Sequence, residues 1–271
     1  MQTVAPQSIP VRALILDMDG VLWRGSQPIG DLPAIFAAIE RLGLRVVLAT
    51  NNATLTVTQY QQKLAQFGVQ LEAWQIINSP TATAAYLKRR YPEGGPVYVV
   101  GELGLVEAME QQGFHLTPDG EQPLAVVAGL DRGMTYAKID WATRYIRAGA
   151  LFVGTNPDVT FPAPYGLAPG AGAVLAAIQA ATDVRPIIVG KPEPEMYRVA
   201  LERLGCSAAE TLVVGDRLDT DIAGAQALGC PTALVLTGIS TEPEARQAAQ
   251  PPGLIAADLA SVIQHLQGGT P

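Results

Sequence analysis

Two aspartates follow a strongly apolar run in the stretch ALILDMDGVLW, which begins at Ala13. Asp17 and Asp19 are two positions apart, and alternation along an extended chain would send both side chains one way and Met18 the other. Carboxylates are almost never buried without a partner, because removing one from water is costly. The run therefore predicts a strand whose end presents carboxylates to a binding partner.

Further polar residues follow other predicted strands, and ligands bind beyond the carboxyl ends of the strands in an open parallel sheet. Asp221 follows one of these residues, Asp216, in the stretch GDRLDTDIAG. Carboxylates about 4 Å apart repel each other by about 4 kcal/mol per pair at an effective dielectric constant of about 20, so a cation is expected. Oxygen ligands with no His or Cys nearby favour Mg²⁺. The other residues at predicted strand ends are Thr50, Asn51, Lys191, Thr237 and Gly238.

Three of these residues suit a phosphate. Thr50 offers a hydroxyl, the backbone N–H groups after it lead towards a predicted helix, and Lys191 adds a compact positive charge. Each motif taken alone also fits a turn, a helix cap or a solvated loop. Four motifs at four separate strand ends together favour a functional site.

The elements that would position these residues alternate between short β-branched runs and helical patterns, which is typical of a parallel sheet covered by helices. One helix begins near Pro33, and another has a candidate capping box at Thr56 and Gln59. Two more helices are expected from Pro194 to Gly205 and from about Thr220 to Gly229. The strand runs of this set are VRALIL, RVVLA, RPIIV, TLVV and TALVL.

A second set of runs, PVYVV, LAVVAGL and ALFVG, interrupts the first and has helices of its own near 81–90, 103–112 and 136–148. The fold class predicted is α/β, with a Rossmann-like parallel-sheet core and an inserted α/β cap domain. We expect the core at 1–78 and 186–271 and the insert at 79–185. The end of the insert is a Pro- and Gly-rich loop, which is long for a connection.

Composition narrows the class of protein further. The chain of 271 residues has a net charge of −7 and no basic run, which argues against nucleic acid or an anionic membrane as a partner. Its apolar stretches are too short to span a bilayer, and the start MQTVAPQSIP lacks the features of a secretory signal. These features predict a cytoplasmic protein. Cys206 and Cys230 are expected to be packed, reduced thiols.

The motifs resemble those of the haloacid dehalogenase superfamily of phosphatases over nearly the whole chain. DMDGVLW is similar to the first motif, TNN to the second, GKPEPEMY to the third and GDRLDTDIAG to the fourth. The inserted segment, with GLDRGMTYAKI, GTNPD and PGAGA, is similar to the large α/β cap of the NagD-like group. That group includes para-nitrophenylphosphatases, phosphoglycolate phosphatases and nucleotide phosphatases.

The resemblance implies a role for each motif residue. Asp17 would attack phosphorus and form an aspartyl-phosphate, while Asp19 would protonate the leaving alcohol and then deprotonate water. A dehalogenase needs neither this acid nor a metal, so a phosphatase is favoured. The implied Mg²⁺ ligands are Asp17, the backbone carbonyl of Asp19, and Asp216, with Asp221 supporting them, and the implied phosphate-binding residues are Thr50, Asn51 and Lys191.

The cap and a flap after the first motif would set specificity for a small phosphomonoester, of the sugar phosphate, nucleotide or phosphoglycolate type. Asn156, Asp158 and Tyr165 are the candidate substrate contacts. The vitamin B6-phosphate phosphatases of the NagD-like group carry a His in this loop, and NPDVTFPAPYGLAPG has none, so the resemblance argues against pyridoxal phosphate. Trp23 would lie in the flap, and an ordinary core aromatic is an equal interpretation of this residue. The resemblance also implies that the cap can form homodimer contacts.

Three alternatives belong to other classes of protein. A phosphate-sensing protein of the same fold, without efficient turnover, would be expected to lose Asp19 or Lys191, and both are present. A dinucleotide-binding oxidoreductase is disfavoured because no G-x-G-x-x-G follows the first predicted strand. A serine hydrolase is disfavoured because the chain has no G-x-S-x-G.

Overall fold

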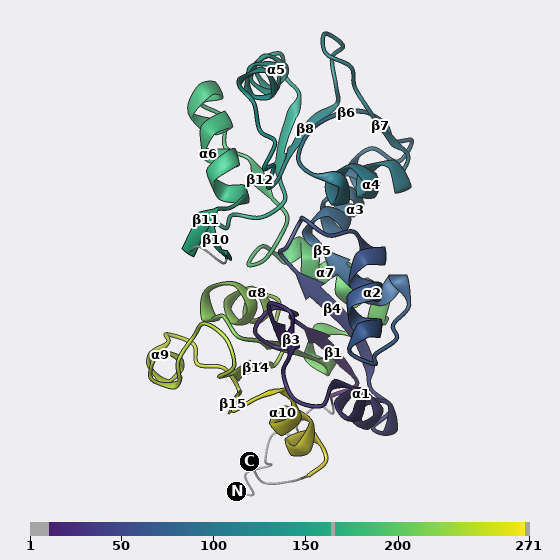
Figure 1. The fold of residues 1–271 in the computed structure, drawn as a ribbon, viewed down its shortest axis with the longest axis vertical. Helices are drawn as coiled ribbons and strands as arrows, with labels where there is room; N and C mark the ends of the chain where they lie inside the picture. Colours follow the sequence, from purple (N-terminus) through teal and green to yellow (C-terminus); the bar gives the residue numbers. More distant parts are fainter. Residues whose placement is uncertain (1–10, 164–165, 269–271) are drawn as a thin grey trace, which may run out of the picture. The chain divides into compact units, whose positions relative to one another are not determined.

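The computed structural model describes residues 11–163 and 166–268, which form two compact units. The first unit comprises the described parts of Met1–Leu48, Phe67–Val69 and Ala200–Pro271. The second comprises Ala49–Gln66 and the described parts of Gln70–Val199. Each unit contains a parallel sheet with helices (Figure 1), so the predicted α/β class is confirmed. The expected domain boundaries, 1–78 with 186–271 and 79–185, stay a prediction.

The first unit is built on a parallel sheet with strand order β15-β14-β13-β1-β4. In the register of this sheet, Leu16 pairs with Val214 on one side and with Leu48 on the other. The residues that follow β1 and β13 therefore emerge side by side at the carboxyl edge. The strands are β1 (Ala13–Leu16), β4 (Arg45–Thr50), β13 (Thr211–Gly215), β14 (Thr232–Val235) and β15 (Leu254–Ala256).

Helices of the first unit begin where the sequence supplies caps. The Asp31 side chain accepts the Ala34 N–H at the start of α1, and the Asp258 side chain accepts the Ser261 N–H at the start of α10. These two helices pack against each other. The remaining elements are the hairpin β2 (Trp23–Arg24) and β3 (Gln27–Pro28), and the helices α1 (Leu32–Arg41), α8 (Ala223–Ala227), α9 (Glu242–Gln247) and α10 (Leu259–Leu266). Helix α7 (Pro194–Leu204) carries the chain from the second unit into the first.

The second unit has a five-stranded parallel sheet of order β12-β9-β8-β6-β7. Its strands are β6 (Gly95–Val100), β7 (Phe114–Leu116), β8 (Ala125–Ala128), β9 (Leu151–Gly154) and β12 (Ile187–Ile188). The unit also holds β5 (Ile76–Asn78), the hairpin β10 (Thr160–Ala163) and β11 (Gly166–Pro169), and the helices α2 (Val57–Gln66), α3 (Ser79–Arg90), α4 (Leu103–Gln111), α5 (Tyr136–Arg147) and α6 (Ala171–Thr182).

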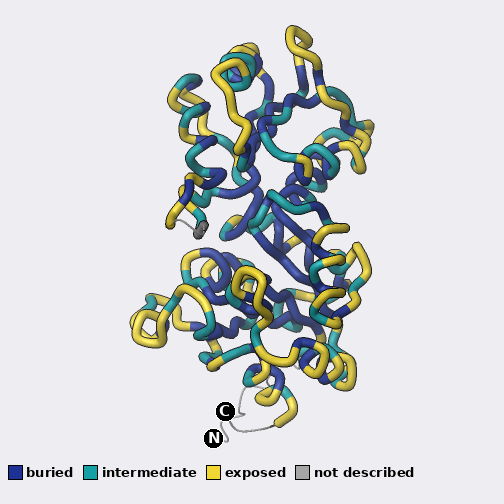
Figure 2. Tube along the Cα trace, in the orientation of Figure 1, coloured by how far each residue is buried: buried dark blue, intermediate teal, exposed yellow. Residues whose placement is uncertain are grey.

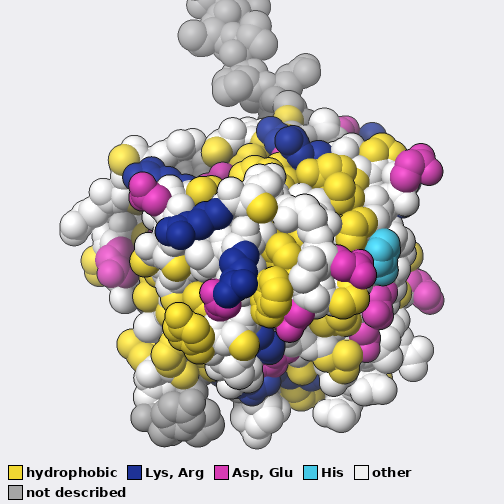
Figure 3. Space-filling view, turned by 90° about the horizontal axis from the view of Figure 1, so that it is seen from above, with side chains coloured by type: hydrophobic (Ala, Val, Ile, Leu, Met, Phe, Trp, Pro, Cys, Tyr) yellow, Lys and Arg dark blue, Asp and Glu magenta, His cyan; other side chains and the backbone are white. Residues whose placement is uncertain are grey.

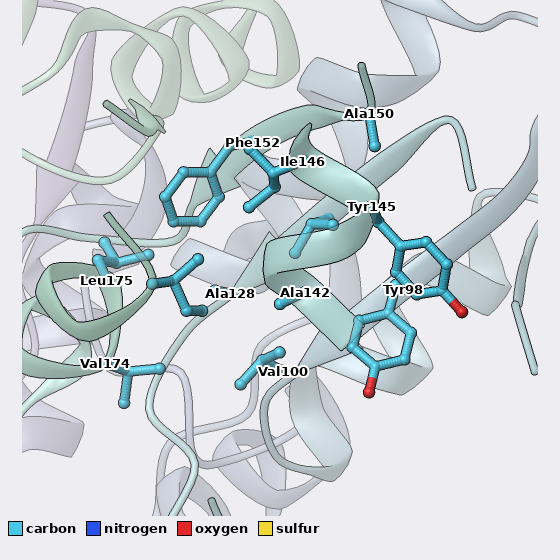
Figure 4. Close-up of a cluster of buried hydrophobic side chains, with 12 residues drawn as sticks. Tyr98, Val100, Ala128, Ala142, Tyr145, Ile146, Ala150, Phe152, Val174 and Leu175 are labelled. Carbon is cyan, nitrogen blue, oxygen red and sulfur yellow. The ribbon is translucent and has the colours of Figure 1, made fainter. Parts of the chain in front are cut away.

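The core of the second unit lies where α5 and α6 pack on this sheet (Figure 4). Phe152 from β9 and Leu175 from α6 are both buried in this cluster. The rings of Tyr98 and Tyr145 lie 5.0 Å apart at an interplanar angle of 59°, a tilted pairing that aromatic rings favour. In both units the strands are mostly buried while the helices expose one side (Figure 2), the pattern expected of sheets covered by helices.

One strand lies in a different sheet from the one predicted. The run RPIIV was expected beside the core strands, but its two strand residues extend the sheet of the second unit, where Ile187 pairs with Val153. A β-branched run indicates a strand without specifying its neighbour, because pairing depends on tertiary packing. The helix expected from about Thr220 also differs, since it opens with a π-helical turn, Leu218–Ile222, before α8.

Other local predictions are confirmed. Thr56 and Gln59 form the capping box of α2, in which each side chain accepts the backbone N–H of the other residue. Cys206 and Cys230 are free thiols, and burial raises the pKa of Cys230 to about 11.

Among the described residues, no helix is both long and apolar enough to cross a membrane. On the face drawn in Figure 3, Lys and Arg side chains are interspersed with Asp and Glu side chains. The predictions about nucleic acid and dimer formation stay predictions.

Candidate active site

Three aspartates of the first unit converge at the carboxyl edge of its sheet. Asp17, Asp216 and Asp221 each offer a carboxylate oxygen, and these oxygens lie within 4.8 Å of one another. All three residues are buried, with exposed fractions of 8%, 3% and 2%. Asp17 follows β1 directly, and its N–H donates to the Val214 carbonyl at 2.9 Å. We call this group the aspartate cluster.

Asp221 enters the cluster because the loop after β13 folds back on itself. Its Oδ2 accepts the backbone N–H groups of Asp216 at 3.2 Å and of Arg217 at 3.1 Å. A side chain at Gly215 would overlap the Asp221 side chain. The last residue of β13 therefore has to be glycine for the loop to close in this way.

Asp216 is held between two further glycines. A Cβ at Gly20 would lie 2.6 Å from Asp216 Oδ2, and a Cβ at Gly238 would overlap the same carboxylate. The Ile239 N–H donates to Asp216 Oδ2 at 2.8 Å. Gly20 also has a φ of +87°, a conformation that side-chain-bearing residues rarely adopt. The loops after β1, β13 and β14 thus meet around one carboxylate.

The chemistry of the aspartate cluster fits a divalent cation. Three buried carboxylates this close repel one another by several kcal/mol if all are ionised. The cluster contains only aspartates, and hard cations such as Mg²⁺ and Ca²⁺ prefer oxygen ligands. Members of the cluster also accept backbone hydrogen bonds, which fix their side chains.

Asp19 lies outside the cluster, and its side chain is exposed. The extended alternation expected from Asp17 to Asp19 stops early, because β1 ends at Leu16 and the chain then turns. The Met18 carbonyl accepts three backbone N–H groups, from Val21 at 3.3 Å, Leu22 at 2.8 Å and Trp23 at 3.3 Å. In this turn Met18 is buried and Asp19 is exposed.

The predicted phosphate-binding residues lie together in the second unit. The Asn51 side chain bonds the backbone of Lys191 twice, accepting its N–H at 2.8 Å and donating to its carbonyl at 2.9 Å. The Lys191 ammonium donates to the Ala49 carbonyl at 2.9 Å, and the residue is 3% exposed. Thr50 is buried, and its hydroxyl accepts the Asn52 N–H at 3.1 Å. The convergence of TNN and GKP, 140 residues apart, is therefore observed.

Two of the candidate substrate contacts bond to the same loop. The Asn156 amide is buried and donates to the Asn51 carbonyl at 2.8 Å. Asp158 Oδ2 accepts the Asn51 side-chain amide at 3.1 Å. Their contact with substrate stays a prediction, and Tyr165 lies outside the described residues.

Sequence reasoning missed two residues that shape these sites and left the role of a third, Trp23, open. The Ser79 hydroxyl donates to the Asn51 carbonyl at 2.6 Å, although Ser79 reads as an ordinary first residue of a helix. A Cβ at Gly190 would lie 2.7 Å from Asn51 Oδ1, and a glycine directly before Lys191 was the available signal. The third residue, Trp23, is fully buried and donates its indole N–H to Asp19 Oδ1 at 2.8 Å.

Comparisons with known proteins identify the family. A family model described as haloacid dehalogenase-like hydrolase matches residues 14–115, and one described as HAD-hydrolase-like matches residues 188–262. The acid sugar phosphatase of Staphylococcus aureus is 36% identical over 256 residues, covering 94% of this chain and 98% of the relative.

Two solved structures are similar over nearly their whole length. The p-nitrophenyl phosphatase from Archaeoglobus fulgidus has a TM-score of 0.88 and 30% identity, covering 94% of this chain and 99% of its own. NagD from Escherichia coli K-12 has a TM-score of 0.86 and 32% identity, covering 93% of this chain and 98% of its own.

Proposed function

The chain belongs to the haloacid dehalogenase-like hydrolases and is a phosphoric monoester hydrolase, and we propose that it hydrolyses small phosphomonoesters with Mg²⁺ through an aspartyl-phosphate. The observation that carries this proposal is the aspartate cluster. A buried group of three carboxylates is unfavourable alone, and it becomes favourable when a cation and an anionic substrate complete it.

Asp17 is the proposed nucleophile. One of its carboxylate oxygens attacks phosphorus, and the bond from phosphorus to the leaving oxygen breaks. Asp19 gives its proton to that oxygen, so the first product leaves as a neutral alcohol. In the second step Asp19 takes a proton from the attacking water, and the bond between Asp17 and phosphorus breaks to release inorganic phosphate.

Mg²⁺ would be held by the carboxylates of Asp17 and Asp216 and by the backbone carbonyl of Asp19, with Asp221 supporting this set. When bound, it would supply positive charge that offsets the carboxylates and the phosphoryl oxygens. The hydrogen bond from Ile239 to Asp216 and the two to Asp221 keep these side chains oriented in its absence.

The phosphoryl oxygens are assigned to the Thr50 hydroxyl, the Asn51 backbone N–H and the Lys191 ammonium. The Asn51 side chain is used in holding the backbone of Lys191, which is why we assign binding to its backbone. Donors of this kind accelerate phosphoryl transfer by positioning the group and stabilising its charge.

Sugar phosphates are the first substrate class to test, because the curated Staphylococcus aureus relative is named an acid sugar phosphatase. Nucleoside monophosphates and phosphoglycolate complete the panel. The loop after β9, which holds Asn156 and Asp158, is the proposed source of selectivity. Exchanging residues 156–170 should change which phosphates are accepted while sparing hydrolysis of an activated ester.

Release of p-nitrophenol from p-nitrophenyl phosphate tests the proposal directly. We expect release with Mg²⁺, none with a chelator, and none from Asp17→Asn with an unchanged circular dichroism spectrum. Asp119→Asn is the control, because this aspartate lies outside the cluster. Retained turnover in folded Asp17→Asn would overturn the nucleophile assignment. Absence of release under every condition, with the sugar phosphate panel also negative, would favour a phosphate-sensing protein.

A further inference from the structure

The buried ring of Trp23 donates a hydrogen bond to the carboxylate of Asp19, an exposed residue. Its side chain is fully buried, and its ring lies 5.9 Å from that of Phe67 at an interplanar angle of 42°. Its indole N–H donates to Asp19 Oδ1 at 2.8 Å, a short distance for a bond of this type. The Asp19 side chain is otherwise at the surface, where a carboxylate would exchange between rotamers.

The backbone sets up this pairing. Asp19 and Trp23 form an isolated bridge, and the Gly20 N–H donates to the Trp23 carbonyl at 2.8 Å. The Thr237 hydroxyl donates to the Gly20 carbonyl at 2.6 Å, and the Arg24 guanidinium donates to the Thr237 carbonyl at 2.6 Å. Both ends of the turn are therefore tied to the loop after β14, so that the indole and the carboxylate keep one relative position.

Resting on the acid–base role proposed above for Asp19, we propose that Trp23 is a positioning residue that holds the Asp19 side chain in one orientation through the hydrogen bond from its indole N–H to Oδ1. The indole supplies no proton to the reaction, and it acts only by holding Asp19.

Two substrates of similar shape separate this role from a structural one. Phenyl phosphate has a leaving group that needs a proton, since a phenol has a pKa near that of Tyr, about 10. The nitro group of p-nitrophenyl phosphate stabilises its leaving anion. We expect Trp23→Phe to lower kcat/KM about tenfold for phenyl phosphate and less than about twofold for p-nitrophenyl phosphate, because proton transfer contributes about 10² to 10⁴ to such steps.

Controls isolate the N–H group. Phe67→Leu disturbs the packing of Trp23 but keeps its N–H, and Trp74→Phe replaces a tryptophan that is 46% exposed. Both should leave the ratio of kcat/KM for the two substrates unchanged. If Trp23→Phe does not fold, replacing the Trp23 indole with benzothiophene removes the N–H at nearly constant shape.

A double-mutant comparison with Asp19→Asn decides between outcomes. In that background Trp23→Phe should cause no further selective loss on phenyl phosphate. If Asp19→Asn lowers kcat/KM more for phenyl phosphate, but Trp23→Phe lowers kcat/KM equally for both substrates, the positioning role is wrong while the proposed function stands. If Asp19→Asn shows no selectivity, the acid role fails and this inference fails with it.

Discussion

The aspartate cluster of the first unit and the Asn51–Lys191 network of the second accommodate buried charge in different ways. In the cluster, three like charges are pressed together by loops whose glycines leave room for them. In the network, the Asn51 side-chain amide bonds to the backbone of Lys191, and the buried Lys191 ammonium donates to the Ala49 carbonyl. The first arrangement gathers charges of one sign, whereas the second joins a cation to neutral hydrogen-bonding groups.

The largest test of this contrast is Asp216→Asn. Turnover should fall by about 10²-fold or more, as expected for losing a group that stabilises charge in the transition state. In a chelator the variant should unfold at higher denaturant concentration than the parent protein. Relief of one repulsion is worth about 1 to 4 kcal/mol between charges 4 Å apart, for effective dielectric constants from about 80 down to about 20. Lower stability of the variant under chelator would break the contrast.

Gly238→Ala tests the packing side of the cluster. The added methyl group would overlap the Asp216 carboxylate, so we expect a loss of about 1–3 kcal/mol in stability together with a loss of turnover. Gly133→Ala is the matched control, because its Cβ would lie 3.4 Å from the nearest atom, Asp131 Oδ1. Thermal melting and p-nitrophenyl phosphate assays of both variants measure the difference. Equal behaviour of the two would show that the glycines are dispensable.

Asn51→Asp tests the network in the same way. The change removes the donor to the Lys191 carbonyl and sets a second carboxylate beside Asp158, which should cost about 1–3 kcal/mol. Asn52→Asp is a close control, because the Asn52 side-chain oxygen accepts the Thr54 N–H and hydroxyl, and an aspartate oxygen can accept the same two bonds. Denaturant unfolding should therefore separate two isosteric changes at adjacent positions. A loss of the same size in both would contradict the assignment.

The smallest expected effect concerns the ion pair of Glu102 and Arg132 in the second unit. The side-chain hydrogen bond from Arg132 holds the pKa of Glu102 below its usual 4.5. This pair therefore stabilises the fold at pH values above the pKa of the unfolded glutamate, and the contribution disappears as the pH falls through the lower folded value. Glu102→Gln should cost less than about 1 kcal/mol at pH 7, because Arg132 is exposed. A cost that does not shrink as the pH falls through the lowered pKa of Glu102 would exclude an ionic origin.

Sequence reasoning recovered features that depend on neighbouring residues. The capping box at Thr56 and Gln59 and the strand preceding Asp17 are specified within a few positions, so they were predictable. The meeting of TNN with Lys191 was predictable in a different way, from the resemblance of the two motifs to a known family, although the strand before Lys191 joins the sheet of the second unit.

Features set by tertiary packing were not predictable. Nothing local in Ile187–Ile188 specifies which sheet it joins, and the correct pairing with β9 depends on the completed second unit. Trp23 fitted a core aromatic and a flap residue equally well. The structure shows a buried ring with its polar edge on Asp19, so the two interpretations describe different parts of one side chain.

The hydrogen bonds between Asn51 and Lys191 have a consequence for how this chain can be rearranged. They join positions 140 residues apart, so the long segment between them leaves and returns at nearly the same point. Segments with adjoining ends tolerate exchange and circular permutation, because the surrounding chain meets the same two attachment points whatever lies between. The hydrogen bonds of Asn51 thus mark the point at which a segment from a related chain could be exchanged, provided that the replacement keeps β5, the strand next to β4 in its sheet.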